Sequence, residues 1–106
     1  MSEKLKHRAD LNGPWGSTAA EDFDADEHLK RGEFCYHRDE IGVIKWITFW
    51  PLDCGTWLTV SILPNRQANG HSWTLTGPED APTLHPSVNA NGIWHGFLTA
   101  GVAKAC

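Results

Sequence analysis

Hydrophobic and polar residues alternate in short segments over the C-terminal two thirds of the chain, a pattern typical of β-strands with one buried face. In the clearest segment, Leu58, Val60 and Ile62 point to one side, while Thr59 and Ser61 point to the other. This segment is therefore predicted to be a strand that covers a hydrophobic core with one face and meets polar surroundings with the other.

Other short segments also have the residue pattern of β-strands, and residues typical of turns separate them. The pairs Asn69-Gly70 and Asn91-Gly92 are typical of tight hairpin turns, and Ala100-Gly101 is a weaker third signal. Apolar residues on both faces indicate that one of the strands is central. Short strands with turns every eight to twelve residues predict a mainly β fold, a small antiparallel sandwich or open barrel. Besides the strand above, the predicted strands are residues 34–37, 43–50 (the central one), 72–76 and 93–98.

Residues 1–31 are polar and acidic, and we expect them to form an N-terminal arm with at most one short helix. Ser17 or Thr18 could cap a helix over about residues 19–30, with Gly32 as its stop signal. The sequence therefore predicts two parts, the arm at residues 1–31 and a β domain at residues 32–106.

Length and charge narrow the class of protein. A chain of 106 residues suits one domain. Nine basic residues against 13 acidic ones give a net charge of −4, which argues against nucleic acid as the main partner. The first ten residues are charged and no apolar run approaches about 20 residues, so we expect neither a signal peptide nor a membrane helix. The expected setting is the cytoplasm, with a protein as partner and the oligomeric state undetermined.

Three cysteines are an odd number, so in a reducing compartment they are better read as core residues or metal ligands than as disulfides. If Ala100-Gly101 forms a two-residue turn, His95 lies opposite Cys106, at a separation that suits two ligands of one zinc ion. If the turn has three residues, the register shifts and Cys106 moves to the other face of the sheet.

A closed zinc site needs further ligands. Cys54 lies on a turn after Pro51 and is the third candidate, so the predicted metal ligands are Cys54, His95 and Cys106. Cys35 and His37, two positions apart on a strand, are a rival pair. If the site is absent, the cysteines are small core residues and His95 is a hydrogen-bonded histidine. The candidates for a fourth ligand are Cys35, Asp53, His71 and His85.

Six tryptophans in a chain of this size are mainly expected to fill the core. Trp57 is the exception, because it falls on the polar side of its strand and could belong to a partner-binding patch. Nucleophilic catalysis finds little support: no Asp or Asn is spaced to orient a histidine, and Ser87, which follows a proline, is interpreted as a turn residue.

The element Pro82-Thr83-Leu84-His85-Pro86-Ser87, followed by Trp94-His95-Gly96-Phe97 and Cys106, resembles the DUF6527 family of bacterial and phage proteins. The resemblance covers roughly residues 33–106 and implies a histidine strand, a glycine turn and a following cysteine that together bind zinc. It carries over to His95 first, and then to Cys54 and Cys106.

These observations predict a small non-enzymatic β binding module, stabilised by zinc, in a bacterial or phage accessory protein. A phage inhibitor of a host defence system, acting through a protein partner, is one concrete version. Two alternatives remain open: a metallo-enzyme whose zinc has three protein ligands and a water, and a metal-free β interaction domain.

Overall fold

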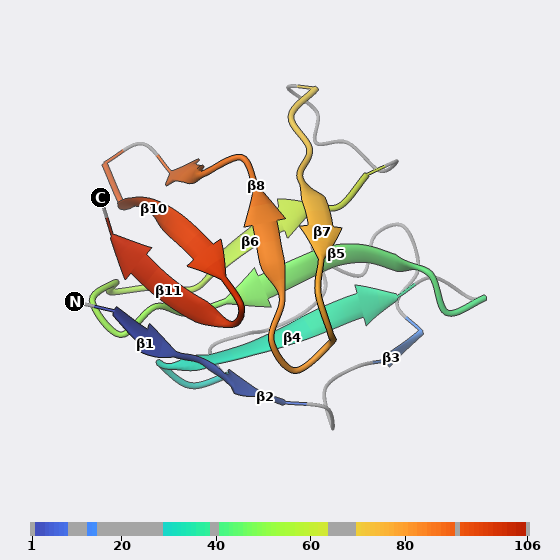
Figure 1. The fold of residues 1–106 in the computed structure, drawn as a ribbon, viewed down its shortest axis with the longest axis horizontal. Coiled ribbons are helices and arrows are strands. Elements are labelled where there is room, and N and C mark those ends of the chain that lie inside the picture. The colour runs from blue at the N-terminus through green and yellow to red at the C-terminus, as the bar shows by residue number, and fades with distance from the viewer. Residues whose placement is uncertain are drawn as a thin grey trace.

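The fold is built from short strands in three sheets. The computed structural model describes residues 2–8, 13–14, 29–38, 41–63, 70–90 and 92–105, and all regular structure within these ranges is β (Figure 1). The predicted mainly β fold class is thereby confirmed, and the strands described do not form a closed barrel.

One sheet is five-stranded and has a long antiparallel meander at its centre. Strands β4 (Glu33–Arg38), β5 (Ile44–Phe49) and β6 (Leu58–Ser61) follow one another along the chain. On the outer side of β4, the short strands β2 (Lys6–His7) and β3 (Gly13–Pro14) both pair with it in parallel. The backbone groups of β2 and β3 thus form hydrogen bonds with the edge of β4 that would otherwise be exposed.

The second sheet holds the C-terminal hairpin. Its order is β1 (Ser2–Lys4), β11 (Val102–Ala105), β10 (Trp94–Thr99) and β9 (Val88–Ala90), all antiparallel. A separate hairpin is formed by β7 (Thr74–Thr76) and β8 (Thr83–His85). Strands β1 to β3 thus come from the expected arm, whereas the expected helix falls almost wholly outside the described residues. The boundary at residue 31 stays a prediction.

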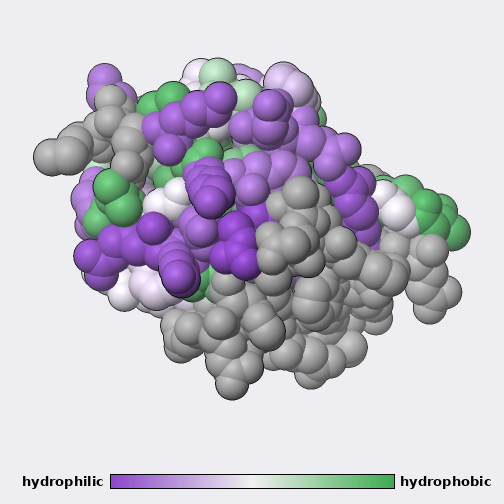
Figure 2. Space-filling view, turned by 90° about the horizontal axis from the view of Figure 1, so that it is seen from below, coloured by the Kyte–Doolittle hydropathy of each residue, from purple (hydrophilic) through white to green (hydrophobic). Residues whose placement is uncertain are grey.

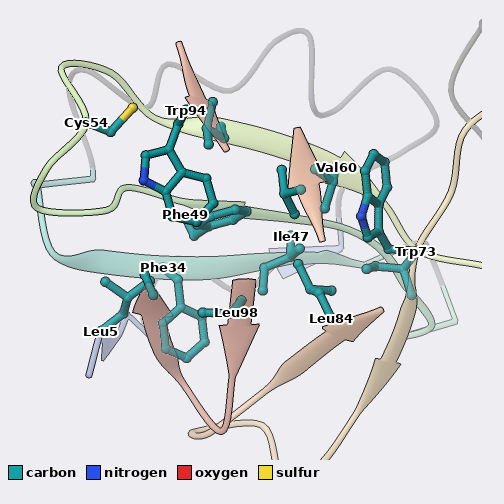
Figure 3. Close-up of a cluster of buried hydrophobic side chains, with 14 of the residues drawn as sticks. Leu5, Phe34, Ile47, Phe49, Cys54, Val60, Trp73, Leu84, Trp94 and Leu98 are labelled. Atoms are coloured by element: carbon teal, nitrogen blue, oxygen red, sulfur yellow. The ribbon is translucent and has the colours of Figure 1, made fainter. Parts of the chain in front are cut away.

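The core lies between the two larger sheets, with β8 beside them (Figure 3). The buried faces of β4 and β5 meet the buried face of β10, and the ring of Trp94 stands edge-on to that of Phe49 at 5.8 Å between centroids. Apolar burial is the main force that holds such layers together. The central side chains include Phe34, Ile47, Phe49, Leu84, Trp94 and Leu98.

On the face shown in Figure 2, the described surface is mainly hydrophilic, and apolar side chains form small separate patches among polar ones. Among the described residues, Ile41 in the turn between β4 and β5 is the most exposed large apolar side chain. Scattered apolar residues of this kind are ordinary for a protein surface.

The final hairpin has the first of the two registers considered from the sequence. Thr99 pairs with Val102, so Ala100 and Gly101 form a two-residue turn, both with positive φ (51° and 77°). The described pairs of this hairpin end with Gly96 and Ala105, so the expected pairing of His95 with Cys106 stays a prediction. Cys106 itself lies outside the described residues.

The segment before β8 holds this turn in place. The Ala100 amide donates to Thr83 Oγ1 at 2.8 Å, and the Gly101 amide donates to the Pro82 carbonyl at 2.8 Å. A Cβ atom on Gly101 would lie 3.1 Å from the Ala81 Cα, so the close approach favours glycine at this position. The element of residues 82–84 therefore works as a brace for the hairpin that carries β10.

On the second face of the five-stranded sheet, three polar side chains lie in a row, each within hydrogen-bonding distance of the next. His37 Nε2 and Thr48 Oγ1 are 2.6 Å apart, and Thr48 Oγ1 lies 2.7 Å from Thr59 Oγ1. His37 and Cys35 point the same way, as predicted from their spacing, and both are completely buried. Burial disfavours the charged imidazolium and lowers the pKa of His37 to about 4.

Gly96 generates a first prediction, because any side chain there would collide with its surroundings. A Cβ atom would lie 2.3 Å from the Lys104 carbonyl oxygen and 2.7 Å from the ring of Trp94. We expect Gly96→Ala to lower the free energy of unfolding by about 1 to 3 kcal/mol, measured by urea denaturation. Gly55→Ala is the control, since nothing lies within 4 Å of its Cβ position. Equal stability of the two variants would contradict this account of β10.

The buried His37 generates a second prediction, on acid stability. The pKa of histidine in an unfolded chain is about 6.5, so the folded state with its lower pKa favours the neutral ring. The stability that this difference contributes is complete above pH 6.5 and is lost as the pH falls toward 4. We expect a loss of about 2 kcal/mol between pH 7 and 5 from this group.

Denaturant unfolding at both pH values measures the effect, with His37→Gln as the test variant. The pH dependence in this window should shrink in His37→Gln and persist in His85→Gln, in which the substituted histidine is exposed. If the free energy of unfolding falls between pH 7 and 5 as much in His37→Gln as in the unsubstituted protein, other groups cause the acid sensitivity.

Candidate active site

A cavity of about 500 Å³ lies between the start of β9 and the segment that leads into β7. This volume falls within the range of roughly 300 to 1,000 Å³ that is usual for ligand sites. The wall on the side of β9 includes Ser87 and Asn89, and the opposite wall comes from the segment of residues 70–73. The lining residues are Gly70, His71, Ser72, Trp73, Pro86, Ser87 and Asn89.

Ser87 stands at the end of the segment that enters β9 and is partly exposed. Its carbonyl oxygen accepts a hydrogen bond from Trp73 Nε1 at 3.3 Å, which ties the backbone at Ser87 to the opposite wall of the cavity. The peptide bond between His85 and Pro86 is cis. The hydroxyl of Ser87 is thus carried by a backbone that is fixed on both sides, by β9 and by the indole of Trp73.

The register of β9 and β10 brings His95 to the same face as Ser87. His95 pairs with Asn89, and Gly96 pairs with Val88. Burial alternates along both strands, so that Val88 is buried while Asn89 and His95 are exposed. Side chains alternate along a strand, so Ser87, which immediately precedes Val88, shares the exposed side with Asn89.

In this register, His95 is the diagonal neighbour of Ser87 and the direct neighbour of Asn89. Diagonal pairs across antiparallel strands have Cα atoms roughly 7 to 8 Å apart and Cβ atoms closer, within reach of long side chains. An imidazole is therefore able to approach the hydroxyl of Ser87, and Asn89 lies directly opposite His95 on the same face.

A hydroxyl, an imidazole and an amide in this order form a nucleophile, a general base and a group that orients the base. From the sequence, Ser87 was interpreted as a turn residue, and no Asn or Asp was found at a spacing that would orient a histidine. In the structure, Asn89 lies directly opposite His95. The hairpin signal at residues 91 and 92 could have indicated this pairing, but only the three-dimensional register selects the face.

Two further serines lie near the cavity. Ser72 lines the wall opposite Ser87, and its hydroxyl donates to the Ser61 carbonyl at 3.4 Å. Ser61 is completely buried. Ser87 differs from both because it shares a sheet face with a histidine on the neighbouring strand.

The predicted zinc ligands take up different surroundings. Cys54 is buried in the main core, with its Sγ 4.0 Å from the Ile93 carbonyl, and Figure 3 shows it near Trp94. His95 follows Trp94 on β10 and points to the opposite, exposed side. The described residues therefore do not bring Cys54 and His95 together, and this pair does not fit a common metal ion. With Cys106 outside the described residues, the set of three stays a prediction.

The candidates for a fourth ligand are equally dispersed. Cys35 packs with Leu29 on the second face of the five-stranded sheet. Asp53 Oδ1 accepts a hydrogen bond from Trp94 Nε1 at 3.0 Å, His71 lines the cavity, and His85 is exposed on β8. In the described part of the chain, no group of three or more His, Cys, Asp or Glu side chains is placed to hold a metal ion.

Trp57, the expected partner-binding residue, is only partly exposed. Its ring packs against the small cluster of Leu29 and Cys35. This contact gives Trp57 a share in the packing of the five-stranded sheet, and its role toward a partner stays a prediction.

A membrane-spanning segment is also absent from the described ranges: none of them contains a helix long and apolar enough to cross a bilayer.

Comparison with known protein families identifies the family of this chain. Neither the curated proteins nor the solved structures include a match to the chain. A family model matches residues 20–106, and the family is described as "Bacterial ubiquitination-like system serine protease (BubE)". The matched range contains Ser87, Asn89 and His95.

This match corrects several expectations from the sequence. The family is not DUF6527, and the description as a serine protease overturns the non-enzymatic binding module together with its metallo-enzyme and metal-free alternatives. The family description also contradicts the emphasis on a phage protein and on zinc binding, while zinc as a cofactor stays a prediction. Those expectations treated the cysteines and His95 as metal ligands. The β9–β10 register instead gives His95 a different chemical neighbour, Ser87, on the same sheet face. The chain belongs to the BubE family, whose members are described as serine proteases of a bacterial ubiquitination-like system.

Proposed function

We propose that this protein is a serine protease of a bacterial ubiquitination-like system, with Ser87 as the nucleophile and His95 as the general base. The observation that carries the assignment is the β9–β10 register, which sets His95 diagonally across from Ser87 on one exposed face beside the cavity. The family match supports the reaction class.

In the proposed mechanism, the Ser87 hydroxyl attacks the carbonyl carbon of an amide bond, and His95 takes the proton. The tetrahedral adduct then expels the amine, which receives that proton from His95, and an acyl ester remains on Ser87. His95 next removes a proton from water, which attacks the ester; the adduct releases the acid and expels the Ser87 oxygen, which takes the proton back from His95. Each step requires only that His95 exchange one proton with a neighbouring atom.

Asn89 has the role of orienting His95. An asparagine amide can accept a hydrogen bond from one imidazole nitrogen, which leaves the other nitrogen free to face the serine. The direct pairing of Asn89 with His95 across the two strands supports this role. Asn89 is therefore a positioning residue in the proposal.

The substrate class follows from the system named by the family. Ubiquitin-like modifiers are attached through the carboxyl group of their C-terminal tail, so the bond to be cleaved is an amide at the end of such a tail. The partner of this protein is then another protein, either a modifier or a modified target. An open cavity at the edge of a sheet suits a substrate that presents an exposed segment of chain.

The nucleophile assignment is tested with an alkyl fluorophosphonate, which forms a covalent bond with activated serines. We expect intact-mass and peptide-mass spectrometry to find one adduct per chain, on Ser87, and none in Ser87→Ala. Ser72→Ala is the matched control, because it removes the other partly exposed serine of the same cavity and should keep the adduct. Labelling at Ser72, or no labelling of a folded protein, would refute the assignment.

The base is tested through the rate of the same labelling. Loss of a general base typically costs about 10²- to 10⁴-fold in rate. We expect His95→Ala to label at least about 100-fold more slowly than the unsubstituted protein, with an unchanged thermal midpoint because His95 is exposed. His71→Ala and His85→Ala should label within a few-fold. A large loss in His71→Ala alone would transfer the role to the histidine that lines the cavity.

The orienting role of Asn89 predicts a graded effect. We expect Asn89→Ala to slow labelling by about 10- to 100-fold, since the base is kept but its orientation is lost. Asn89→Asp retains an acceptor oxygen and should recover most of the rate. If Asn89→Ala and Asn89→Asp slow the reaction equally, the side chain does not act through an accepted hydrogen bond.

A further inference from the structure

The cavity beside Ser87 borders an unoccupied strand edge. Strand β9 comes last in the order β1-β11-β10-β9, so within the described part of the chain it pairs with β10 alone. Backbone groups of successive residues in an antiparallel strand point alternately toward the two edges. At least one of Val88 and Asn89 therefore presents its N–H and C=O on the side away from β10.

From this arrangement we propose that the cavity is a groove in which the substrate binds as an extended strand paired with the outer edge of β9. The proposal rests on the proposed function and defines its substrate class: an amide preceded by a flexible, extended segment of about three residues. Exposed strand edges commonly recognise extended peptides in this way, with the main chain supplying affinity.

The opposite wall of the groove is rigid enough to define a slot. Trp73 forms a parallel bridge with Ile62, its amide donates to the Ser61 carbonyl at 3.0 Å, and its carbonyl accepts from the Leu63 amide at 3.0 Å. The indole of Trp73 also reaches across to the Ser87 carbonyl. The wall is thus fixed to the five-stranded sheet, while the other wall belongs to the four-stranded sheet.

The dimensions of the groove suit a short piece of chain. Strand β9 has three residues, which correspond to about 10 Å of extended backbone. A neighbouring strand would lie about 4.8 Å from β9, and Ser87 and Asn89 line the cavity of about 500 Å³ next to this strand. Ser87 stands at the beginning of β9, so a strand bound along that edge brings its carbonyl group to the nucleophile.

We expect the groove to hold the part of the substrate that lies on the acyl side of the scissile bond. In conjugates of one modifier with many targets, the modifier tail is the shared element, and its carboxyl group is the one that forms the ester on Ser87. Recognition of the main chain along β9 would accept this tail independently of the target protein. The walls contribute polar, uncharged contacts from Ser72 and Asn89, so no charged side chain is required on the tail.

N-methyl scanning of a covalent probe tests the proposal without altering the protein. The probe is acetyl-Ala-Ala-Ala-Ala with a C-terminal diphenyl phosphonate, which labels an active serine from the acyl side. Analogues carry a methyl group on one backbone nitrogen at a time, and the alkyl fluorophosphonate reports on the nucleophile alone. Mass spectrometry measures the rate at which each of these probes labels Ser87.

Strand pairing predicts an alternating pattern. N-methylation at the nitrogens that face β9 should slow labelling about tenfold or more, and methylation at the alternate nitrogens should change the rate less than about threefold. A uniform or absent effect, with normal labelling by the fluorophosphonate, would overturn the strand-binding proposal and leave the proposed function intact. Failure of both probes on folded protein would overturn the proposed function itself.

Discussion

The packing of the Trp94 ring on Gly96 is the contact on which the candidate site depends. The two residues lie on the same buried face of β10, and the ring leaves no room for a side chain at position 96. The indole also donates to Asp53 Oδ1 and stands against Phe49. Three independent contacts therefore keep the Trp94 face of β10 turned toward the core.

The orientation of β10 decides what His95 can do. A shift of one residue in a strand exchanges its two faces completely. With Trp94 fixed inward, His95 must point outward, to the face that β9 shares through Asn89. A buried tryptophan thus determines the position of an exposed histidine. In this sheet, the packing of the core and the geometry of the site both depend on the orientation of β10.

Much of the fold could be predicted from the sequence because local rules govern it. The alternation at Leu58, Val60 and Ile62 was sufficient to predict β6. The sequence left two registers open for the last hairpin, and the structure has the one with a two-residue turn at Ala100 and Gly101. The site depends on relations that no local pattern contains. Cys54 and His95 are compatible as ligands by type, yet the sheet lies between their side chains. Ser87 gains its significance only from a neighbour eight positions along the chain.

Residues 2–7 connect the two main layers through their backbone. Strand β1 pairs with β11 in one sheet, and β2 follows at once and pairs with β4 in the other. Between them, the Leu5 amide donates to the Gly101 carbonyl at 2.7 Å, and the Leu5 side chain is buried. This segment works as a clasp, so its release by proteolysis would uncouple the two layers and loosen β11 behind the strand that carries His95.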